Sequence, residues 1–385
     1  MRPDPPCATV DGVSRFAHKV VVVVVADIAA VVVAGCATPP PPPPPPPPKA
    51  AKEEPKEEPE EPSEPTTWEE VPDFYGSKCP GPFFDLPKPT TVTVGARTFT
   101  ITGSTLKLEG GPWKGPLKIG VLGAVKDPDP DTRANIKKAV REFKKAGVQF
   151  VVVNGDLIGE DAGDLAKVIA MLGDEIALPV FAHSGNYEWT TAFTQVMADA
   201  AKTHPQLFNM NLLRHVDFGG VHLFSLPGWS VRQYVKSAAC FYGKKDVEAL
   251  KEQIKAVVAK GEVVIVTAHG PPRGKGKQSI DFAHDAGNVG DEDLQRMLVD
   301  VPVHFGLFSH ILESGGRATT DVERQPPVKL PMRTAARSLY LNAGSASSFG
   351  WAMNDKRTSR GLAAIFTLDD IKSGGRARVT FLKLR

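Results

Sequence analysis

The sequence predicts a layered α/β domain, and three patterns support this prediction. Short runs rich in β-branched residues and poor in charge alternate with stretches that carry apolar residues at helical spacing. Such alternation is typical of strands that helices cover. The last part of the chain adds strand-like runs without helical stretches between them, which indicates that a second sheet completes the layers. A chain of 385 residues with 42% apolar content is long enough to bury a sizeable core.

Each expected element has its own signal in the sequence. Buried strands are expected at six central runs, LKIGVL, VQFVVV, LPVFA, VHLFSL, EVVIVTA and VHFGLF, and at three closing runs, SLYLNAG, LAAIFTL and ARVTFLKL. Helices are expected where apolar residues form one stripe: Ile136, Val140 and Phe143; Leu165, Val168, Ile169 and Leu172; and Val247, Leu250, Ile254 and Val257. The first stripe stops at Gly147, a common helix terminator.

Residues 1–35 are typical of a secretory signal peptide. Arg15 and Lys19 precede the apolar run VVVVVVADIAAVVVAG, which is short for a membrane span and ends at Cys36. The ending VAGC resembles the lipobox of bacterial lipoproteins, and this resemblance implies that Cys36 is lipidated and becomes the first mature residue. We therefore expect an exported chain that is lipid-anchored to a membrane of the bacterial cell envelope. A buried helix or an uncleaved anchor is the alternative interpretation.

Three further regions follow along the chain. Residues 36–67 combine a run of prolines with Lys, Glu and Pro, a composition that cannot bury apolar surface and predicts a disordered tether. Residues 68–115 carry turn residues and the strand-like run TTVTVGARTFTIT, so we expect an N-terminal segment with short strands that packs against the main domain. Residues 116–385 hold the alternating pattern of the main domain.

The charge and the cysteines of the chain limit which partners it can bind and in which compartment it is expected. The formal net charge is only +2, and no basic stripe with interleaved aromatic residues is present, so nucleic acid is not expected as a partner. Cys79 and Cys240 are the cysteines of the globular part. A disulfide between them fits an exported protein, and two separate buried thiols are the alternative.

Four polar residues follow predicted strands, and each is of a type that binds metals. They are Asp156 after VQFVVV, Asn186 after LPVFA, His269 after EVVIVTA and His310 after VHFGLF. In layered α/β folds, side chains at the carboxyl ends of strands converge on one crevice. Taken singly, the Asp fits a helix cap, the Asn a turn and each His a satisfied core residue. Their shared position favours a site for a divalent metal.

The order of these residues resembles the calcineurin-like metallophosphoesterases. The motifs of that family are D-x-H, G-D-x-x-D, G-N-H-[DE], a lone His and G-H-x-H; the corresponding stretches here are AVK, GDLIG, GNYE, AHG and SHIL, within residues 116–348. The resemblance implies a layered β-sandwich flanked by helices, with two metals at one site. It implies Asp156 as the bridging ligand, with three more ligands for the second metal: Asn186, His269 and His310.

The ligands of the first metal are missing from the matching positions. Ala124 and Lys126 stand at the Asp and the His of D-x-H, and Leu312 stands at the last His of G-H-x-H. The retained residues all belong to the second metal, so the resemblance implies one divalent ion, with Mn, Zn and Fe all compatible with the ligand set. Two further losses concern catalysis: Tyr187 replaces the His of G-N-H-[DE], and Gly159 replaces the second Asp of G-D-x-x-D.

Lys126 and Tyr187 are the candidates for catalytic roles. The ammonium of Lys126 either reaches the vacated metal position, where it would offset the charge of Asp156 or hold a phosphate oxygen, or points to solvent from the loop KDPDPD. In the family, the residue at position 187 helps to protonate the leaving group, and a Tyr hydroxyl is a weaker acid than a protonated His. Three acidic residues of that loop are alternative ligands, although the prolines between them favour a surface turn: Asp127, Asp129 and Asp131.

Two hypotheses about function follow. In the first, the chain is an envelope-anchored hydrolase of phosphate esters that works with a single metal at a degenerate site. In the second, it is a non-catalytic pseudoenzyme that serves the cell envelope as a metal- or phosphate-binding scaffold. The expected partners are a phosphate-ester small molecule or an envelope component, and a membrane reached through the lipid anchor.

Overall fold

The computed structural model describes residues 63–159, 161–353 and 356–385. The predicted signal peptide, the predicted lipidation site at Cys36 and nearly all of the predicted tether lie outside these residues. Within them, no helix combines the length and the apolarity needed to cross a membrane.

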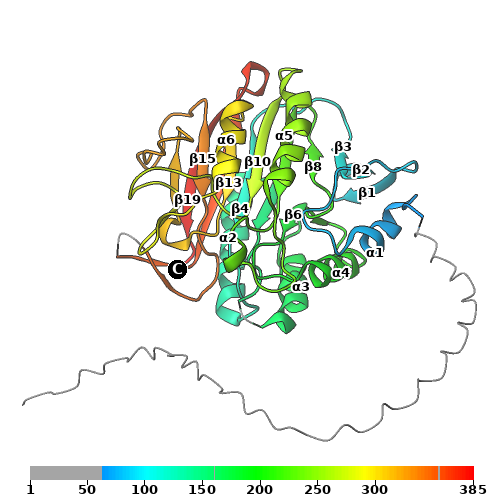
Figure 1. Ribbon diagram of the computed structural model, residues 1–385, viewed down its shortest axis with the longest axis horizontal. Coiled ribbons are helices and arrows are strands. Elements are labelled where there is room, and N and C mark those ends of the chain that lie inside the picture. The colour runs from blue at the N-terminus through cyan, green and yellow to red at the C-terminus, as the bar shows by residue number, and fades with distance from the viewer. Residues whose placement is uncertain (1–62, 160, 354–355) are drawn as a thin grey trace, which may run out of the picture. The chain divides into compact units, whose positions relative to one another are not determined.

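Six strands form the smaller of two large sheets (Figure 1). In spatial order they are β19 (Arg376–Lys383), β18 (Leu362–Asp369), β4 (Leu117–Leu122), β5 (Phe150–Asn154), β6 (Val180–His183) and β7 (Leu207–Asn209). The strands β4 to β7 run parallel, whereas β18 pairs antiparallel with both β4 and β19. Parallel neighbours need crossover connections, which accounts for the helices between these strands.

Nine strands form the larger sheet. In spatial order they are β1 (Thr90–Val94), β2 (Arg97–Thr102), β3 (Thr105–Leu108), β8 (His215–Asp217), β9 (Val221–Leu226), β10 (Val263–Ala268), β13 (Phe305–Phe308), β15 (Leu339–Asn342) and β14 (Arg317–Thr319). The central strands β9, β10, β13 and β15 run parallel. Two short ladders stand outside both sheets: β11 (Phe282–Ala283) with β12 (Gly287–Asn288), and β16 (Trp351–Ala352) with β17 (Thr358–Ser359).

The described residues contain six α-helices and five short 3₁₀ turns. The helices are α1 (Val71–Tyr75), α2 (Pro130–Ala146), α3 (Leu165–Glu175), α4 (Thr190–Ala201), α5 (Lys244–Val258) and α6 (Glu292–Asp300). The 3₁₀ turns are η1 (Trp68–Glu70), η2 (Ala162–Asp164), η3 (Arg232–Tyr234), η4 (Leu312–Ser314) and η5 (Ile371–Ser373). The three helices that the apolar stripes predict are α2, α3 and α5. The sequence analysis missed α4 and α6, although Leu294, Met297 and Leu298 of α6 are buried.

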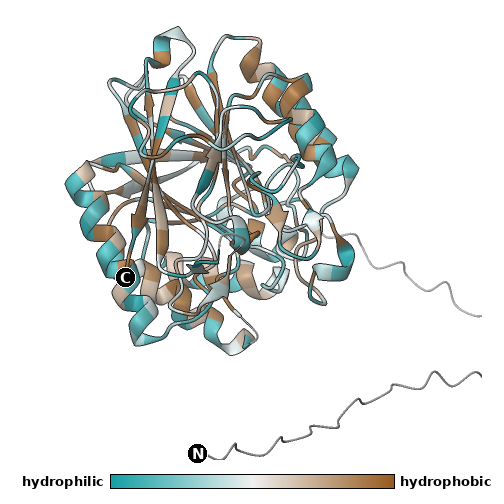
Figure 2. Cartoon of the chain, turned by 90° about the vertical axis from the view of Figure 1, so that its left-hand side faces the viewer, coloured by the Kyte–Doolittle hydropathy of each residue, from teal (hydrophilic) through white to brown (hydrophobic). Residues whose placement is uncertain are grey.

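The elements pack as helix, sheet, sheet, helix around three buried clusters. The two sheets face each other across a core that includes Phe150, Phe218 and Ile265, with 4.6 Å between the ring centroids of Phe150 and Phe218. The helices α2, α3 and α4 cover the other face of the smaller sheet, and α5 and α6 cover that of the larger sheet. In Figure 2 the strands are mostly brown, whereas the helices carry both brown and teal. The predicted layered α/β fold is confirmed.

The bounds of α2 follow from local signals. Pro130 occupies its first position, where a missing N–H breaks no helical bond. Ile136 and Phe143 are buried against the smaller sheet, as their spacing predicts. Gly147 has a φ of 71°, a left-handed conformation that suits glycine, and its N–H donates to the Lys144 carbonyl at 3.1 Å.

A second sheet completes the layers, as the sequence indicates, and the closing strands divide between the two sheets. β18 pairs with β4 of the smaller sheet, and β15 pairs with β13 of the larger sheet. Seven of the eight residues of β18 are buried, because both faces of this strand are covered. Its continuous apolar run therefore fits an interior strand better than a strand of a separate layer.

The N-terminal segment is tied into the larger sheet. β3 pairs in parallel with β8, so β1 to β3 continue the sheet at one edge. Cys79 and Cys240 form a disulfide, which decides between the two alternatives left by the sequence. The buried guanidinium of Arg214 donates to the Gly81 carbonyl at 2.6 Å and packs on the ring of Phe83.

Candidate metal centre

The four predicted ligands stand at the carboxyl ends of four strands, two in each sheet. Asp156 and Asn186 follow β5 and β6 of the smaller sheet, and His269 and His310 follow β10 and β13 of the larger sheet. The side chains at these strand ends meet where the two sheets adjoin. The structure therefore brings together residues that lie far apart along the chain.

The ligand atoms of these residues lie close to one another. His269 Nε2 is 3.2 Å from Asp156 Oδ1 and 2.9 Å from Asn186 Oδ1. One ligand atom from each of Asp156, His269 and His310 lies within 4.8 Å of the other two. Atoms at this spacing can all be ligands of one metal ion.

The hydrogen bonds of His269 determine which of its ring nitrogens faces the centre of the site. Its Nδ1–H donates to the Asn154 carbonyl at 2.8 Å, so Nε2 turns toward two oxygen atoms, those of Asn186 and Asp156. Asp156 Oδ1 is buried and has no hydrogen-bond partner among the described residues. Lone pairs that face one another in this way require either a cation between them or a second proton on the imidazole. The residues present thus fit a divalent metal.

Neighbouring groups fix the other two ligands. Asn186 Nδ2 donates to the Tyr234 carbonyl at 2.6 Å, which directs Oδ1 toward His269. The ring of His310 lies between those of Trp229 and His269, with centroids 4.5 and 4.6 Å away. Burial, helped by the charge of His269, lowers the pKa of His310 to about 3. His310 is therefore neutral at physiological pH, the state in which an imidazole binds metal.

Four backbone positions at the centre are in the left-handed region. The φ angles are 44° at Ala124, 70° at Lys126, 54° at Asp156 and 56° at His310. Such a conformation costs a non-glycine residue about 1–3 kcal/mol and persists where the surrounding structure enforces it. These residues follow three strands, β4, β5 and β13, and their concentration here indicates that the backbone at this edge of the sheets is shaped for a functional site.

Lys126 points into the centre and not to solvent. Its Nζ donates to Asp156 Oδ2 at 2.6 Å, and only 9% of its side chain is exposed. The ammonium also lies 4.2 Å from the ring centroid of Tyr187. Burial lowers the pKa of Lys126, but the charge of Asp156 outweighs this effect and the net shift is upward. Burial likewise raises the pKa of Asp156, yet the charges of Lys126 and His269 lower it overall, so the pair is ionic.

Glu188 supports the centre, and the sequence analysis missed it. The carboxylate is buried and accepts three backbone N–H groups: Gly185 at 2.6 Å, Ile158 at 3.1 Å and Asp156 at 3.3 Å. These bonds join the loop after β5 to the loop after β6. Burial and the charge of Asp156 raise the pKa of Glu188. The signal was the last letter of GNYE, where the motif G-N-H-[DE] asks for an acid.

The centre opens into a cleft of about 690 Å³. The floor is polar and contains Lys126, Asp156, Asn186 and His310. Aromatic and apolar side chains supply much of the wall, and one guanidinium, that of Arg273, adds positive charge. Arg273 lies in the basic loop PPRGKGKQ, which the buried carboxylate of Asp281 holds by accepting the N–H groups of Gly274 and Gly290 at 3.0 Å.

Comparison with known proteins identifies the family. A profile of the calcineurin-like phosphoesterases matches residues 118–313, more than half of the 385-residue chain. The chain belongs to the calcineurin-like phosphoesterase family. Calcineurin-like phosphoesterases are metal-dependent, and Asp156, His269 and His310 form a triad with the geometry of metal ligands. The chain is thus a phosphoesterase-type hydrolase by family.

Several solved structures are similar to this chain but share little sequence with it. One crystal structure is 12% identical, has a TM-score of 0.50, and is matched over 100% of its length by 70% of this chain. A dimetal phosphatase from Danio rerio is 13% identical, covers 71% of this chain and 100% of its own, and has a TM-score of 0.45. GAP50, the anchor in the inner membrane complex of Plasmodium, is 14% identical, with coverage of 71% and 86% and a TM-score of 0.43. No curated protein sequence matches the chain.

The positions that depart from the calcineurin-like phosphoesterase pattern lie around the same centre. The methyl group of Ala124 is buried, and the Ala124 N–H donates to the Gly155 carbonyl at 3.2 Å. Leu312 lines the cleft, and Gly159 lies beside the Lys126 backbone.

The acidic loop residues that the sequence offered as alternative ligands have other contacts or positions in the structure. Asp127 accepts from the Ser347 hydroxyl at 2.8 Å, Asp129 precedes α2, and Asp131 pairs with Arg385 at 3.1 Å.

Proposed function

We propose that this chain hydrolyses phosphate esters at the cell envelope with a single divalent ion. The observation that carries the proposal is that the two carboxylate oxygens of Asp156 have different surroundings. Oδ2 accepts from the Lys126 ammonium, whereas Oδ1 is buried without a hydrogen-bond partner among the described residues and faces His269. One oxygen is therefore available to a metal, and the other is already neutralised by the chain itself.

Four residues would hold the ion. They offer one carboxylate oxygen, one amide oxygen and two imidazole nitrogens, a set that suits Mn, Zn and Fe: Asp156, Asn186, His269 and His310. The hydrogen bonds of His269 Nδ1 and Asn186 Nδ2 to backbone carbonyls orient both ligands before any ion arrives.

Lys126 would take the place of a second ion. A buried carboxylate without a counter-charge is costly, and an ammonium at 2.6 Å supplies one positive charge where the family pattern supplies a metal. The side chain of Lys126 also lines the cleft, as does that of Arg273. A bound divalent ion would add to their positive charge, which Asp156 and Glu313 partly offset in the cleft, and would favour an anionic substrate such as a phosphate ester.

The chemistry divides between the ion and the chain. When bound, a divalent ion polarises a phosphoryl oxygen and activates water. The chain orients the substrate through Lys126, but position 187, where the family has His, holds a Tyr whose ring faces the ammonium groups of Lys126 and Lys236. Loss of assistance from a general acid typically lowers a rate by about 10² to 10⁴. Turnover is therefore expected to be slow.

A metal- or phosphate-binding scaffold without turnover is the second candidate. The arrangement of Tyr187 favours it, because the position that assists the leaving group is occupied by a ring packed beneath two lysines. Under this candidate the same ligands bind an ion or an anion, and no ester is cleaved.

Metal analysis combined with an activity assay separates the two candidates. The purified chain is loaded with Mn²⁺, Zn²⁺ or Fe²⁺, its metal content is measured, and phosphomonoesters and phosphodiesters are offered as substrates. One equivalent of metal, with turnover that Asp156→Asn abolishes, supports the single-metal hydrolase. One equivalent without turnover supports the scaffold. Two equivalents, or none, contradict the single-ion site.

Attachment to the envelope membrane through Cys36 is part of the proposal. The sequence around Cys36 supports it, and a phosphate-ester small molecule or an envelope component would be the partner, with no role for nucleic acid. In the bacterial host, Cys36→Ser should leave the chain unlipidated and move it from the membrane fraction to the soluble fraction. A variant that stays in the membrane fraction would show that the anchor lies elsewhere.

A further inference from the structure

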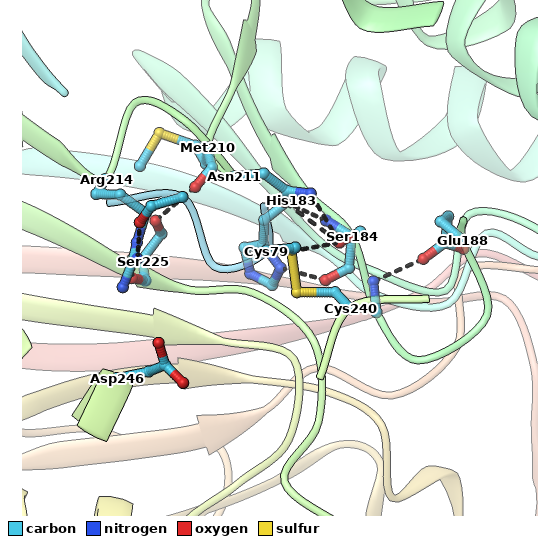
Figure 3. The surroundings of a disulfide bond; sticks show 12 residues. Cys79, His183, Ser184, Glu188, Met210, Asn211, Arg214, Ser225, Cys240 and Asp246 are labelled. Carbon is cyan, nitrogen blue, oxygen red and sulfur yellow. Dashed lines mark hydrogen bonds between the residues drawn. A yellow bond between two sulfur atoms is a disulfide. The ribbon is translucent and has the colours of Figure 1, made fainter. Parts of the chain in front are cut away.

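The Cys79–Cys240 disulfide lies next to Ser184 (Figure 3), at the start of the loop that carries Asn186. The Cα atoms of the two cysteines are 5.1 Å apart, and Cys240 is fully buried. Cys79 belongs to the N-terminal segment between α1 and β1, and Cys240 lies near the end of residues 229–242. We call residues 229–242 the wall loop, because Trp229, Val231 and Tyr234 line one side of the cleft.

The wall loop fixes Asn186 from two sides. Its Tyr234 carbonyl accepts from Asn186 Nδ2 at 2.6 Å, and its Lys236 N–H donates to the Asn186 carbonyl at 3.0 Å. A third bond runs from Thr190 N–H to the Ala238 carbonyl at 2.9 Å. The direction of Asn186 Oδ1, and hence its place at the metal centre, depends on where the wall loop lies.

The wall loop has little regular structure to hold it in place. Its one helical turn is η3, and residues 232–234 and 236–238 are exposed. Trp229, Val235 and Ala239 form a small buried cluster that is separate from the main cores, and Tyr242, the last residue of the loop, packs into the core under α5. Segments with few buried contacts open locally at low cost in free energy. A covalent tie at Cys240 therefore matters more here than it would in a strand of the sheets.

Cys79 sits on the framework beneath the Asn186 loop. Its Sγ lies 3.8 Å from the hydroxyl of Ser184, two residues before Asn186. The Ser184 N–H donates to Asn211 Oδ1 at 2.9 Å, and the Gly81 N–H donates to the Asn211 carbonyl at 2.9 Å. Figure 3 shows Ser184 and Asn211 beside the two cysteines. The disulfide thus joins the wall loop to the same framework that holds the loop of Asn186.

We propose that the Cys79–Cys240 disulfide is a positioning element for Asn186. It holds the wall loop against the framework, and the wall loop in turn keeps the amide oxygen of Asn186 directed at the metal centre. The expected effect of the disulfide on metal affinity rests on the function proposed above, in which Asn186 is a ligand. The expected effect on the position of the wall loop does not depend on that function.

A double-mutant cycle tests the link to metal binding. Mn²⁺ dissociation constants of the full chain are measured by calorimetry for wild type, Cys79→Ala/Cys240→Ala, Asn186→Ala and the combined variant. Loss of the disulfide should weaken Mn²⁺ binding at least tenfold when Asn186 is present. In the Asn186→Ala background it should change binding less than twofold. Equal effects in both backgrounds, or unchanged affinity without the disulfide, would overturn the proposal.

Leu250→Ala serves as a control for general loss of stability, because Leu250 on α5 is buried in the core against the larger sheet and does not line the cleft. Each variant is compared at the same interval below its melting temperature. Leu250→Ala should leave the Mn²⁺ dissociation constant within twofold of wild type, and a tenfold weakening would assign the disulfide effect to stability alone.

Amide hydrogen exchange gives a readout that needs no metal. The N–H groups of Lys236 and Thr190 should exchange at least tenfold faster in Cys79→Ala/Cys240→Ala than in Leu250→Ala. The N–H of Ser309, which donates to the His269 carbonyl at 3.0 Å, should exchange alike in the two variants. If the chain binds no Mn²⁺, the proposed function fails and exchange alone decides. Equal exchange at Lys236 in the two variants would then sink the positioning role.

Discussion

Lys126 sets the charge of the metal centre. Its ammonium and the Asp156 carboxylate form a buried ion pair at 2.6 Å, and a second buried carboxylate, Glu188, lies behind Asp156 on three backbone N–H groups. Buried charges are tolerated only when they are paired or hydrogen-bonded. Both carboxylates meet this condition without a metal, which explains how the chain can fold before an ion binds.

Replacement of Lys126 by Ala should have opposite effects on folding and on metal binding. Without metal, Lys126→Ala removes the ammonium that neutralises Asp156 Oδ2 and leaves His269 beside the buried carboxylate, so the free energy of unfolding should fall by about 3 kcal/mol. The same change frees Oδ2 and removes a positive charge, so Mn²⁺ should bind at least tenfold more tightly, about 1.4 kcal/mol. Urea unfolding and calorimetry measure the two effects.

Lys236→Ala is the matched control for this prediction. Lys236 lies 5.2 Å from the same Tyr187 ring but is exposed on the wall loop. Its replacement should change the free energy of unfolding by less than about 0.5 kcal/mol. Weaker Mn²⁺ binding in Lys126→Ala would contradict the role assigned to the ammonium.

Glu188→Gln should destabilise the chain although the side chain keeps its size. Both carboxylate oxygens of Glu188 accept backbone N–H groups. In the Gln variant an NH₂ group replaces one of these oxygens and cannot accept, so at least one charge-assisted hydrogen bond is lost. The free energy of unfolding should fall by about 2 kcal/mol. Glu252→Gln, on the exposed face of α5, removes a surface pair with Lys255 and should cost less than about 0.5 kcal/mol. Equal losses in the two variants would show that Glu188 does not hold the two loops.

At the level of elements, a row of hydrogen bonds through two imidazoles links the neighbouring strands β3, β8 and β9. The Thr105 hydroxyl lies 3.3 Å from His215 Nδ1, His215 Nε2 lies 2.9 Å from His222 Nδ1, and His222 Nε2 lies 3.0 Å from Glu262 Oε2. All three contacts are satisfied when both imidazoles are neutral and each donates from Nε2. Burial lowers the pKa of His215 to about 3 and lowers that of His222 as well.

Because the fold keeps His215 and His222 neutral, we expect the protein to lose stability in acid. In the unfolded state His215 takes up a proton below about pH 6.5, whereas in the folded state it resists protonation down to about pH 3. The unfolded state therefore binds more protons in this range, and stability falls as the pH falls from about 6.5 to 3. The slope from His215 reaches about 1.4 kcal/mol per pH unit, modified by His222, Asp217 and Lys260 nearby.

Urea unfolding of wild type and His215→Gln at several pH values measures this contribution. The variant should lose less stability than wild type for each unit of pH below about 6.5. Parallel pH profiles would mean that His215 is not held neutral by the fold.

At the scale of the whole molecule, local patterns in the sequence locate the metal centre. Asp156 and His269 each follow a run of β-branched residues, and strand ends in layered α/β folds converge. The order of such residues along the chain therefore predicts their meeting in space. The helix stripes predict α2, α3 and α5 for the same reason, because amphipathic spacing is a local property.

Features that depend on contacts between residues far apart along the chain could not be predicted from local sequence patterns. Nothing near β18 shows that it pairs with β4, and nothing near Asn186 shows that the Tyr234 carbonyl orients its amide. The direction of Lys126 is likewise set by a carboxylate 30 positions away. Cys79 and Cys240 are separated by 161 positions, and their pairing depends on the fold of the chain between them.

Crystals of the chain soaked in Mn²⁺ give the most direct measurement of the central claim. An anomalous difference map should show one peak, enclosed by the side chains of Asp156, Asn186, His269 and His310, with the Lys126 ammonium still on Asp156. A second peak beside Ala124, or a peak that displaces Lys126 from Asp156, would contradict a centre built for one ion.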